Sequence, residues 1–298
     1  MIDWIKNIDP RITAAIVAAL VSMLTLIISL VTKNFMEKKI HSFKLTSEHE
    51  FEQKKKIKSI LSENKIRLIN ACESMNHRFY NFSNNHNKQW HFVNIEKHNP
   101  PDGCYYYISF IYRILAVLSW TRKIEKEMVY LDSTIASTDD LIFIKYLRLF
   151  SFCFCDLDTI TKGFKVDTFI EKDHFFRHNF DEMSGILLNG NELVSYDSFE
   201  EEFADYYPKM DGLCKFIDGI NEKENRLRWD RLQLFHLSII GFLNRYGYDY
   251  QKWDNEKIKN VFSKSRKTKF LDNYKSLIQL LKLDKEKHLM RVIKHAKQ

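Results

Sequence analysis

Two histidines four residues apart form the nearest approach in this sequence to a metal-binding pattern. His174 and His178 would share one face of a helix predicted over residues 168–188, at the spacing that lets two imidazole rings bind one ion. A third ligand would come from Asp173, Asp181 or Glu182. The glutamate of an H-E-x-x-H motif is missing, however, and Arg177 between the histidines would repel a cation. We therefore predict packing and hydrogen bonding for these histidines, with no metal ion and no cofactor.

A second pattern combines an arginine with a histidine. Arg231 and His236 match R-x4-H, which resembles the signature of the HEPN class of all-α ribonucleases, whose Arg and His act on the scissile phosphate. A chain of this length with 11 histidines is expected to contain such a match by chance. Leu232 also stands where a polar residue often follows the arginine. A nuclease that uses Arg231 and His236 is thus an alternative, and otherwise no residue is nominated as catalytic.

Charged residues gather on two predicted helices. The first helix carries His174, Arg177 and His178, and the second carries Arg228, Asp230 and Arg231. Buried arginines require partners. If Asp230 and Glu182 supply them, the cluster is structural, and if an anionic ligand does, the cluster is a binding site. We favour the structural interpretation.

The same two segments are similar to elements of a known family. His174-Phe-Phe-Arg-His-Asn-Phe180 resembles the H-Y-F-R-x-L-Y element of phage abortive-infection proteins of bacteria, with Phe180 where that family usually has Tyr. The segment from Leu227 to Asn244 is similar to the family's second element, an R-x-x-L segment that runs to an aromatic residue and Asn. The resemblance covers residues 169–250. It implies a role in phage defence, a membrane segment ahead of a cytoplasmic helical domain, and no particular catalytic activity.

An uncharged run near the N-terminus determines where the helical domain and its candidate residues are located in the cell. Residues Ile12–Val31 carry no charged side chain, and a helix of that length rises about 30 Å, the thickness of the bilayer hydrocarbon. No cleavage site of the small-x-small type ends the run, so a retained span is predicted at residues 12–32. Lysines follow it at positions 33, 38, 39 and 44. They predict a periplasmic N-terminus (residues 1–11) and a cytoplasmic domain at the bacterial inner membrane.

Two features of this N-terminal region bear on self-association. Small residues recur at helical spacing within the span, where a second copy would approach closely: Ala15, Ala18, Ala19, Ser22, Thr25 and Ser29. After the span, residues 33–83 contain neither Pro nor Gly and are predicted to form a helical stalk. An apolar seam through Ile57, Leu61 and Leu68 is interrupted by Asn64. The seam either pairs with a second copy, Asn64 then fixing the register, or packs on the chain's own domain, which we favour.

The composition of the rest favours long helices. The chain has Gly 8 and Pro 4 against Phe 23 and Tyr 14, so helix breakers are scarce and bulky core residues are plentiful. The predicted fold class is mainly α, with a helical core domain over residues 104–250. Cys104–Asp132 approaches a second span, but Arg113 lies inside it and a buried core helix is predicted instead. Helix starts are expected at Ser137 or Thr138, at Ser198 and at Asn221, and a helix end at Gly247.

The C-terminal region is basic and the cysteines are unpaired. Lys and Arg outnumber Asp and Glu over residues 251–298, which predicts a basic helical tail that faces nucleic acid or anionic lipid, or else forms a solvated surface. Five cysteines without a C-x-x-C pair predict reduced, mostly buried thiols, consistent with a cytoplasmic domain.

These features predict a single-pass inner-membrane protein of phage defence. Its helical cytoplasmic domain would sense a phage-derived trigger or act as an effector, and it would work as an interaction protein more readily than as an enzyme. Two alternatives remain open at this point. One is a membrane-tethered HEPN-like ribonuclease, and the other is an oligomerising scaffold or signalling adaptor at the inner membrane.

Overall fold

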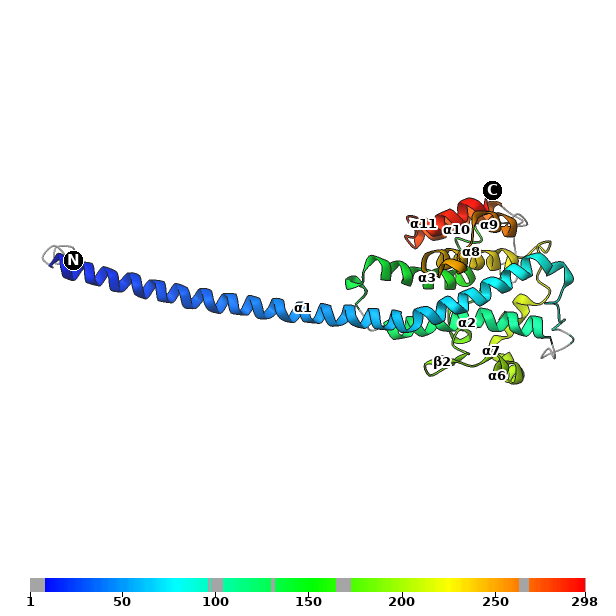
Figure 1. The fold of residues 1–298 in the computed structure, drawn as a ribbon, viewed down its shortest axis with the longest axis horizontal. Coiled ribbons are helices and arrows are strands. Elements are labelled where there is room, and N and C mark those ends of the chain that lie inside the picture. The colour runs from blue at the N-terminus through cyan, green and yellow to red at the C-terminus, as the bar shows by residue number, and fades with distance from the viewer. Residues whose placement is uncertain are drawn as a thin grey trace. The chain divides into compact units, whose positions relative to one another are not determined.

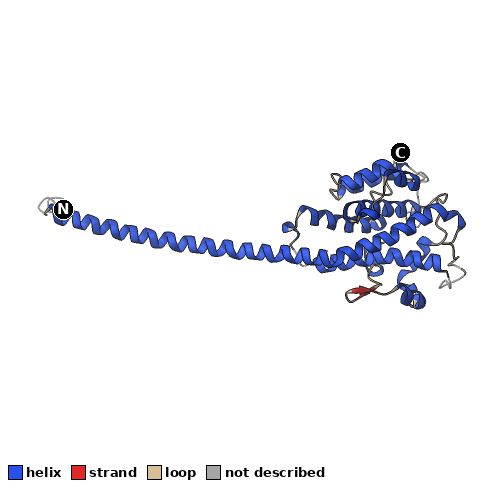
Figure 2. Cartoon of the chain, in the orientation of Figure 1, coloured by secondary structure: helices blue, strands red, loops and turns tan. Residues whose placement is uncertain are grey.

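The computed structural model describes residues 9–95, 97, 104–129, 132–164, 173–262 and 268–297, and these are mainly helical, as predicted (Figures 1 and 2). The longer helices are α1 (Pro10–Asn85), α2 (Tyr105–Met128), α3 (Thr138–Cys155), α7 (Phe203–Ile217), α8 (Arg228–Tyr246) and α10 (Thr268–Leu280). The shorter ones are α5 (Arg177–Met183), α6 (Tyr196–Glu201), α9 (Asn255–Phe262) and α11 (Lys287–Ala296), with 3-10 turns at His86–Lys88, Ser133–Ile135 and Asp249–Gln251. Strands β1 (Leu188–Asn189) and β2 (Glu192–Leu193) form an antiparallel hairpin.

The chain divides into two units, residues 1–55 and 56–298. In the first, α1 is exposed from Pro10 to Lys55, apart from Thr13 and Gln53, which are half-buried. By length and composition alone, α1 is also the one helix in the described part of the chain that is apolar enough to cross a membrane. The hydroxyls of Ser22 and Thr25 donate to the carbonyls of Ala18 and Val21, both at 2.8 Å. These polar groups are thereby satisfied within the helix, as a hydrocarbon environment requires.

The predicted apolar seam of α1 lies in the second unit and packs on the chain's own domain. Ile57, Leu61 and Leu68 are buried there. Asn64 is buried too, and its amide donates to Glu127 of α2 at 2.9 Å. The polar interruption of the seam is therefore satisfied within one chain, and this confirms the favoured alternative. The part of the predicted stalk from residue 56 to residue 83 lies in this compact unit.

Helices α2 and α3 form the next part of the core. α2 is the expected buried helix, with a continuous buried stretch from Ile114 to Thr121. α3 begins after Ser137, whose hydroxyl accepts from the amide of Asp140 while the Asp140 carboxylate accepts from the amide of Ser137. This capping box settles which of the two expected residues caps the helix.

α8 is the central helix, because every side chain from Arg228 to Asn244 is buried. It packs against α3 and α11. The helix begins at Arg228 and not at the expected Asn221, since residues 221–227 form turns. It ends at Gly247 as expected, where a Cβ would lie 2.6 Å from the carbonyl oxygen of Leu243. Close approach of the backbone therefore requires this glycine.

Two further expectations need correction. The helix predicted over residues 168–188 begins only at Arg177, so His174 precedes it, and residues 168–172 lie outside the described part of the chain. The helix expected to start at Ser198 is capped by Ser195, whose hydroxyl accepts from the amide of Ser198. In both cases the helix start is shifted along the chain from the predicted residue.

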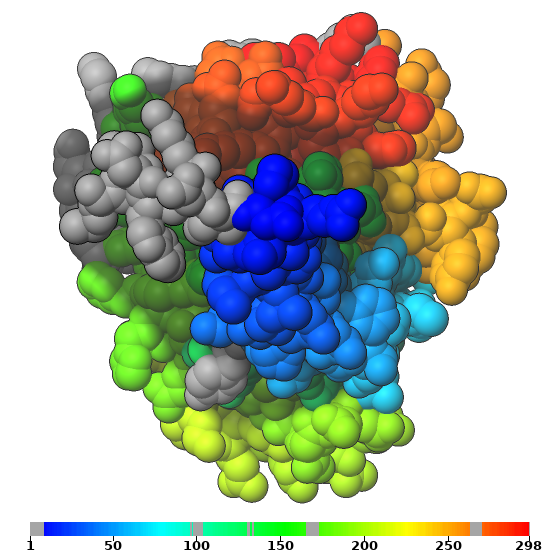
Figure 3. All heavy atoms as spheres, turned by 90° about the vertical axis from the view of Figure 1, so that its left-hand side faces the viewer, coloured from blue at the N-terminus to red at the C-terminus, as the bar shows by residue number. Residues whose placement is uncertain are grey.

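Helices α9 and α11 of the C-terminal region pack within the compact unit. Leu289, Val292 and Ile293 of α11 are buried, and α11 packs against α8 and α9. Glu286 caps α11 and also accepts hydrogen bonds from Tyr146 and Arg245, at 2.8 and 2.9 Å. The basic character remains at the surface through Lys282, Lys285, Lys287 and Lys294, and the C-terminal residues lie on the face shown in Figure 3.

Candidate functional site

Arg228, a member of the predicted polar cluster, is buried and caps another helix. Its guanidinium pairs with the carboxylate of Glu224 at 2.7 and 2.8 Å. Its Nη1 also donates to the carbonyls of Lys215, Phe216 and Asp218, at distances of 2.8–3.2 Å. These carbonyls lie at the C-terminal end of α7, where a positive charge is favourable. Arg228 is therefore committed to holding α7 against the start of α8.

Arg231 and His236, the alternative catalytic pair, are both fully buried and contact different helices. The Nη1 of Arg231 donates to the carbonyls of Cys153 and Phe154, at 3.1 and 3.2 Å, and burial lowers the pKa of this guanidinium to about 10. His236 shares a 2.9 Å hydrogen bond with Asn76 of α1, and burial lowers the pKa of this imidazole to about 3. The structure gives a scissile phosphate no access to either side chain.

The cluster members near α5 are divided among separate surroundings. His178 is exposed, and half-buried His174 lines a cavity of about 240 Å³ with Phe175 and Phe176. Arg177 pairs with Asp181 at 3.1 Å and with Glu125 at 3.7 Å. Asp230 is buried on α8. The structure thus does not gather the cluster into one site, and no group of three metal-ligating side chains occurs in the described ranges.

The small residues predicted as an oligomerisation face all lie on the exposed part of α1. They are Ala15, Ala18, Ala19, Ser22, Thr25 and Ser29. Self-association through them stays a prediction.

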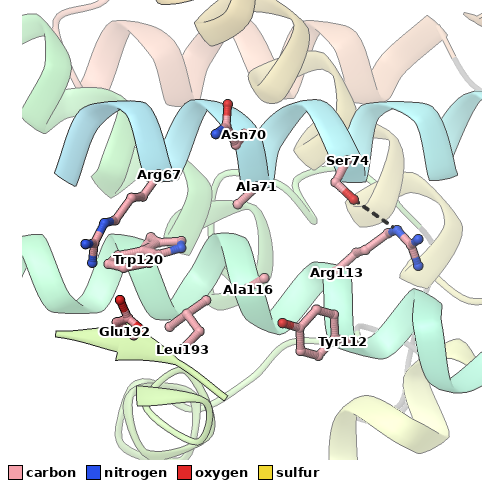
Figure 4. Close-up of a pocket in the computed structure, with 10 residues that line it drawn as sticks. All are labelled: Arg67, Asn70, Ala71, Ser74, Tyr112, Arg113, Ala116, Trp120, Glu192 and Leu193. Carbon is pink, nitrogen blue, oxygen red and sulfur yellow. Dashed lines mark hydrogen bonds between the residues drawn. The ribbon is translucent and has the colours of Figure 1, made fainter. Parts of the chain in front are cut away.

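The structure instead reveals an open site between α1, α2 and β2 (Figure 4). It is a cavity of about 410 Å³. It is lined by Arg67, Asn70, Ala71 and Ser74 of α1, by Tyr112, Arg113, Ala116 and Trp120 of α2, and by Glu192 and Leu193 of β2. Their spacing of three and four places the α1 residues on one helix face, and the α2 residues follow the same period. Ala71 and Ala116 are small, so space remains between the two helices.

Hydrogen bonds fix the hairpin as one wall of this cavity. Gly190, with a φ of 58°, allows the tight turn between β1 and β2. Lys123 donates to the side chain of Asn191 at 3.0 Å, and Tyr112 donates to the carbonyl of Val194 at 2.9 Å. Arg67 donates to the carbonyl of Asn191 while its guanidinium lies 5.2 Å from the ring of Trp120. The Arg67 side chain thereby links α1 to the hairpin and lies beside the ring of Trp120.

Arg113 lies between this cavity and an adjoining one of about 530 Å³. Its Nε donates to Ser74 at 3.1 Å (Figure 4). Its Nη1 donates to the carbonyl of Ser109 at 2.8 Å. The adjoining cavity is lined by Ser74, His77, Arg78, Asn81, Trp90, Tyr105, Tyr106 and Arg113. Ser74 and Arg113 line both, so we name the two cavities together the α1–α2 groove.

The arginines of the α1–α2 groove have partners other than carboxylates in the described part of the chain. Among the described residues, Arg67, Arg78 and Arg113 form no ion pair with a carboxylate. Arg78 is buried, donates to Ser109 at 2.7 Å and lies 4.3 Å from the ring of Tyr106. The groove also presents the rings of Trp90, Tyr105, Tyr106, Tyr112 and Trp120. It therefore combines unneutralised guanidinium groups with flat aromatic surfaces.

Comparison of the chain with models of protein families, with curated proteins and with solved structures finds no match. The resemblance to phage abortive-infection proteins therefore stays a prediction.

Sequence reasoning missed the α1–α2 groove although one signal was present. Arg113 interrupts the apolar stretch Tyr105–Trp120. A charged residue inside an otherwise buried helix also marks the face that is open to solvent or to a ligand. The sequence did not indicate that the β1–β2 hairpin lines the groove, because strands of only two residues have no recognisable alternation of apolar and polar residues.

Proposed function

We propose that this chain is a single-pass protein of the bacterial inner membrane that acts in phage defence, with the α1–α2 groove as the site that senses the trigger. One observation carries the proposal. α1 contributes both the exposed, uncharged run Ile12–Val31 and one wall of the groove. A ligand in the groove would therefore touch the same helix that enters the membrane.

The membrane location is supported by the cost of leaving the apolar run in water. The large side chains of this run are at least half exposed, and burial of each is worth about 1.5–3 kcal/mol. Insertion into a bilayer recovers this free energy. The lysines that follow the run favour a cytoplasmic domain and a periplasmic N-terminus.

The defence role rests on the two elements similar to abortive-infection proteins, His174–Phe180 and Leu227–Asn244. We include self-association of the span through its small residues in the proposal, since a change of oligomeric state is a simple output for a helix that also lines a binding site. The exposed lysines of the C-terminal region suit an anionic surface, of lipid or nucleic acid.

The proposal is tested by expressing the full chain in a bacterium and measuring phage plating. We expect fewer plaques with the intact chain and no protection after deletion of residues 1–33. A chain whose residues 10–32 are replaced by the span of an unrelated single-pass protein separates tethering from specific span contacts, because restored protection would show that only the tether is needed. Unchanged plating across a broad phage panel would refute the defence role.

Leu24→Arg tests the anchor itself, because a charge at the middle of a span costs about 2.5–3.5 kcal/mol. We expect this variant to shift from the membrane fraction toward the soluble fraction, while Lys44→Gln stays with the membranes. Recovery of the intact chain in the soluble fraction would contradict the anchor.

A further inference from the structure

From the α1–α2 groove we infer that this protein binds a small nucleotide, with the base on the aromatic rings and the phosphate on the arginines. The binding follows from the groove alone, and only its role as the defence trigger rests on the proposed function. Three properties of the groove carry the inference: its charge, its ring surfaces and its size.

The charge of the groove differs from that of the rest of the compact unit. Elsewhere, carboxylates pair with Arg122, Arg148, Arg177, Arg226, Arg228 and Arg245. In the groove, Arg67, Arg78 and Arg113 have hydroxyl, carbonyl and ring partners, and no carboxylate in the described part of the chain pairs with them. Glu192 is the acidic side chain among the lining residues. An anion would satisfy these guanidinium groups, whose planar donors match phosphate.

Flat rings supply the second requirement. Tyr105 and Trp90 remain 57% and 44% exposed, although both line the groove. Stacking of a base on an aromatic ring contributes about 1–3 kcal/mol. Tyr112 and Trp120 lie farther along α2 in the first cavity (Figure 4). A ligand that carries both a ring and a phosphate would use both kinds of side chain, whereas inorganic phosphate or a lipid headgroup would leave the rings unused.

The size of the groove and the hydrogen bond that crosses it beside Trp120 favour a small molecule over a continuous nucleic-acid strand. The two adjoining cavities of about 410 and 530 Å³ lie within the range typical of small-molecule sites. The bond from Arg67 to Asn191 joins α1 to the hairpin beside Trp120. A continuous strand would have to displace this bridge.

The experiment uses the full chain, purified in detergent, and titrates it by calorimetry with AMP, GMP, ATP and cyclic di-AMP. We expect at least one of these to bind with a dissociation constant in the micromolar range, about 1–100 μM. Adenosine, guanosine and inorganic pyrophosphate should bind at least tenfold more weakly than the best nucleotide, because each lacks the base or the phosphate.

Matched variants test the assignment to the groove. Arg113→Gln should weaken binding at least tenfold, whereas Arg148→Gln, an arginine on α3 outside the groove, should leave binding unchanged. Tyr105→Ala should weaken binding by at least threefold, and Tyr250→Ala, which removes another exposed ring, should have no effect. Thermal unfolding of each variant identifies any loss that arises from misfolding, and Arg113→Lys should retain part of the affinity.

Each other outcome has a definite meaning. No binding of any nucleotide by the folded chain overturns the inference, and so does equal binding of pyrophosphate or of phosphatidylglycerol vesicles, which would make this a general phosphate or lipid site. Nucleotide binding without phage protection would refute the proposed function alone. Phage protection that survives in a chain unable to bind nucleotide would refute the inference alone.

Discussion

α8 and the α1–α2 groove both combine arginines with aromatic rings, but the two regions use them in opposite ways. On α8, Arg228 is buried and its donors are occupied by Glu224 and three backbone carbonyls. In the groove, Arg67 and Arg113 reach the surface and have no carboxylate partner among the described residues. The comparison teaches that residue type does not distinguish a structural arginine from a binding one. Access and the identity of the partners do.

The largest expected effect is on α8. Arg228→Met should lower the free energy of unfolding by about 3–5 kcal/mol, because it removes the buried guanidinium that the half-buried Glu224 carboxylate and the carbonyls at the end of α7 share as a donor. Urea unfolding of the full chain in detergent measures this loss. Arg148→Met is the control, since its side chain is 52% exposed and should contribute less than about 1 kcal/mol. Equal losses of unfolding free energy in the two variants would show that a buried, fully bonded arginine is no more important for stability than an exposed one.

His236 should make stability depend on pH. Its pKa is lowered by burial to about 3, so the unfolded chain binds this proton more readily than the folded chain does. The contribution of His236 is complete above its unfolded pKa of about 6.5 and falls by about 1.4 kcal/mol per pH unit until about pH 3. Between pH 7 and pH 5 the intact chain should therefore lose about 2 kcal/mol more than His236→Gln. His178→Gln, at an exposed position, should keep the full pH dependence, and a slope unaffected by His236→Gln would show that this imidazole is accessible to protons.

A smaller effect is expected at the end of α8. The added methyl group of Gly247→Ala would lie 2.6 Å from the carbonyl oxygen of Leu243 and 2.9 Å from Oε1 of Gln251. The backbone must shift to accept it, at a cost of at least about 1 kcal/mol. Thermal unfolding against Gly185→Ala, whose nearest contacts would be 3.5 and 3.8 Å, measures the difference. No difference would mean that the end of α8 is more adaptable than its packing indicates.

The smallest effect on stability is expected in the groove. Arg113→Gln should change the free energy of unfolding by less than about 1 kcal/mol, since its guanidinium is half-buried and makes no ion pair with a carboxylate. The same variant should lose nucleotide binding. Urea unfolding and calorimetry on one preparation check both results together. A large loss of stability would place Arg113 with the structural arginines of α8.

The apolar patterns predicted most of the fold. The core helix at Tyr105–Met128, the capping residue Ser137, the end of α8 at Gly247 and the packing of the Asn64 seam within one chain all follow from local rules of hydrophobic spacing and capping. The errors lie at helix starts. Ser195 and Ser198 are both chemically able to cap α6, and in the structure Ser195 is the cap.

The candidate site was harder to predict, because it depends on which residues are neighbours in space. Asn76 and His236 are far apart in the sequence, as are Arg67 and Asn191, yet each pair forms a hydrogen bond. Nothing local to Arg231 reveals that its donors end at the carbonyls of α3. The spacing of apolar residues shows which face of a helix is buried, but it does not show which other segment that face contacts.

The sequence by itself therefore determined the helical class, the apolar run Ile12–Val31 and the charge around it, since these depend on residues close together in the chain. The tertiary structure decided that Arg228 and Arg231 of α8 are internal while Arg67 of α1 and Arg113 of α2 border an open groove. A charge acquires its role from the distance to other charges and from the solvent left around it. Both quantities exist only once the helices have packed.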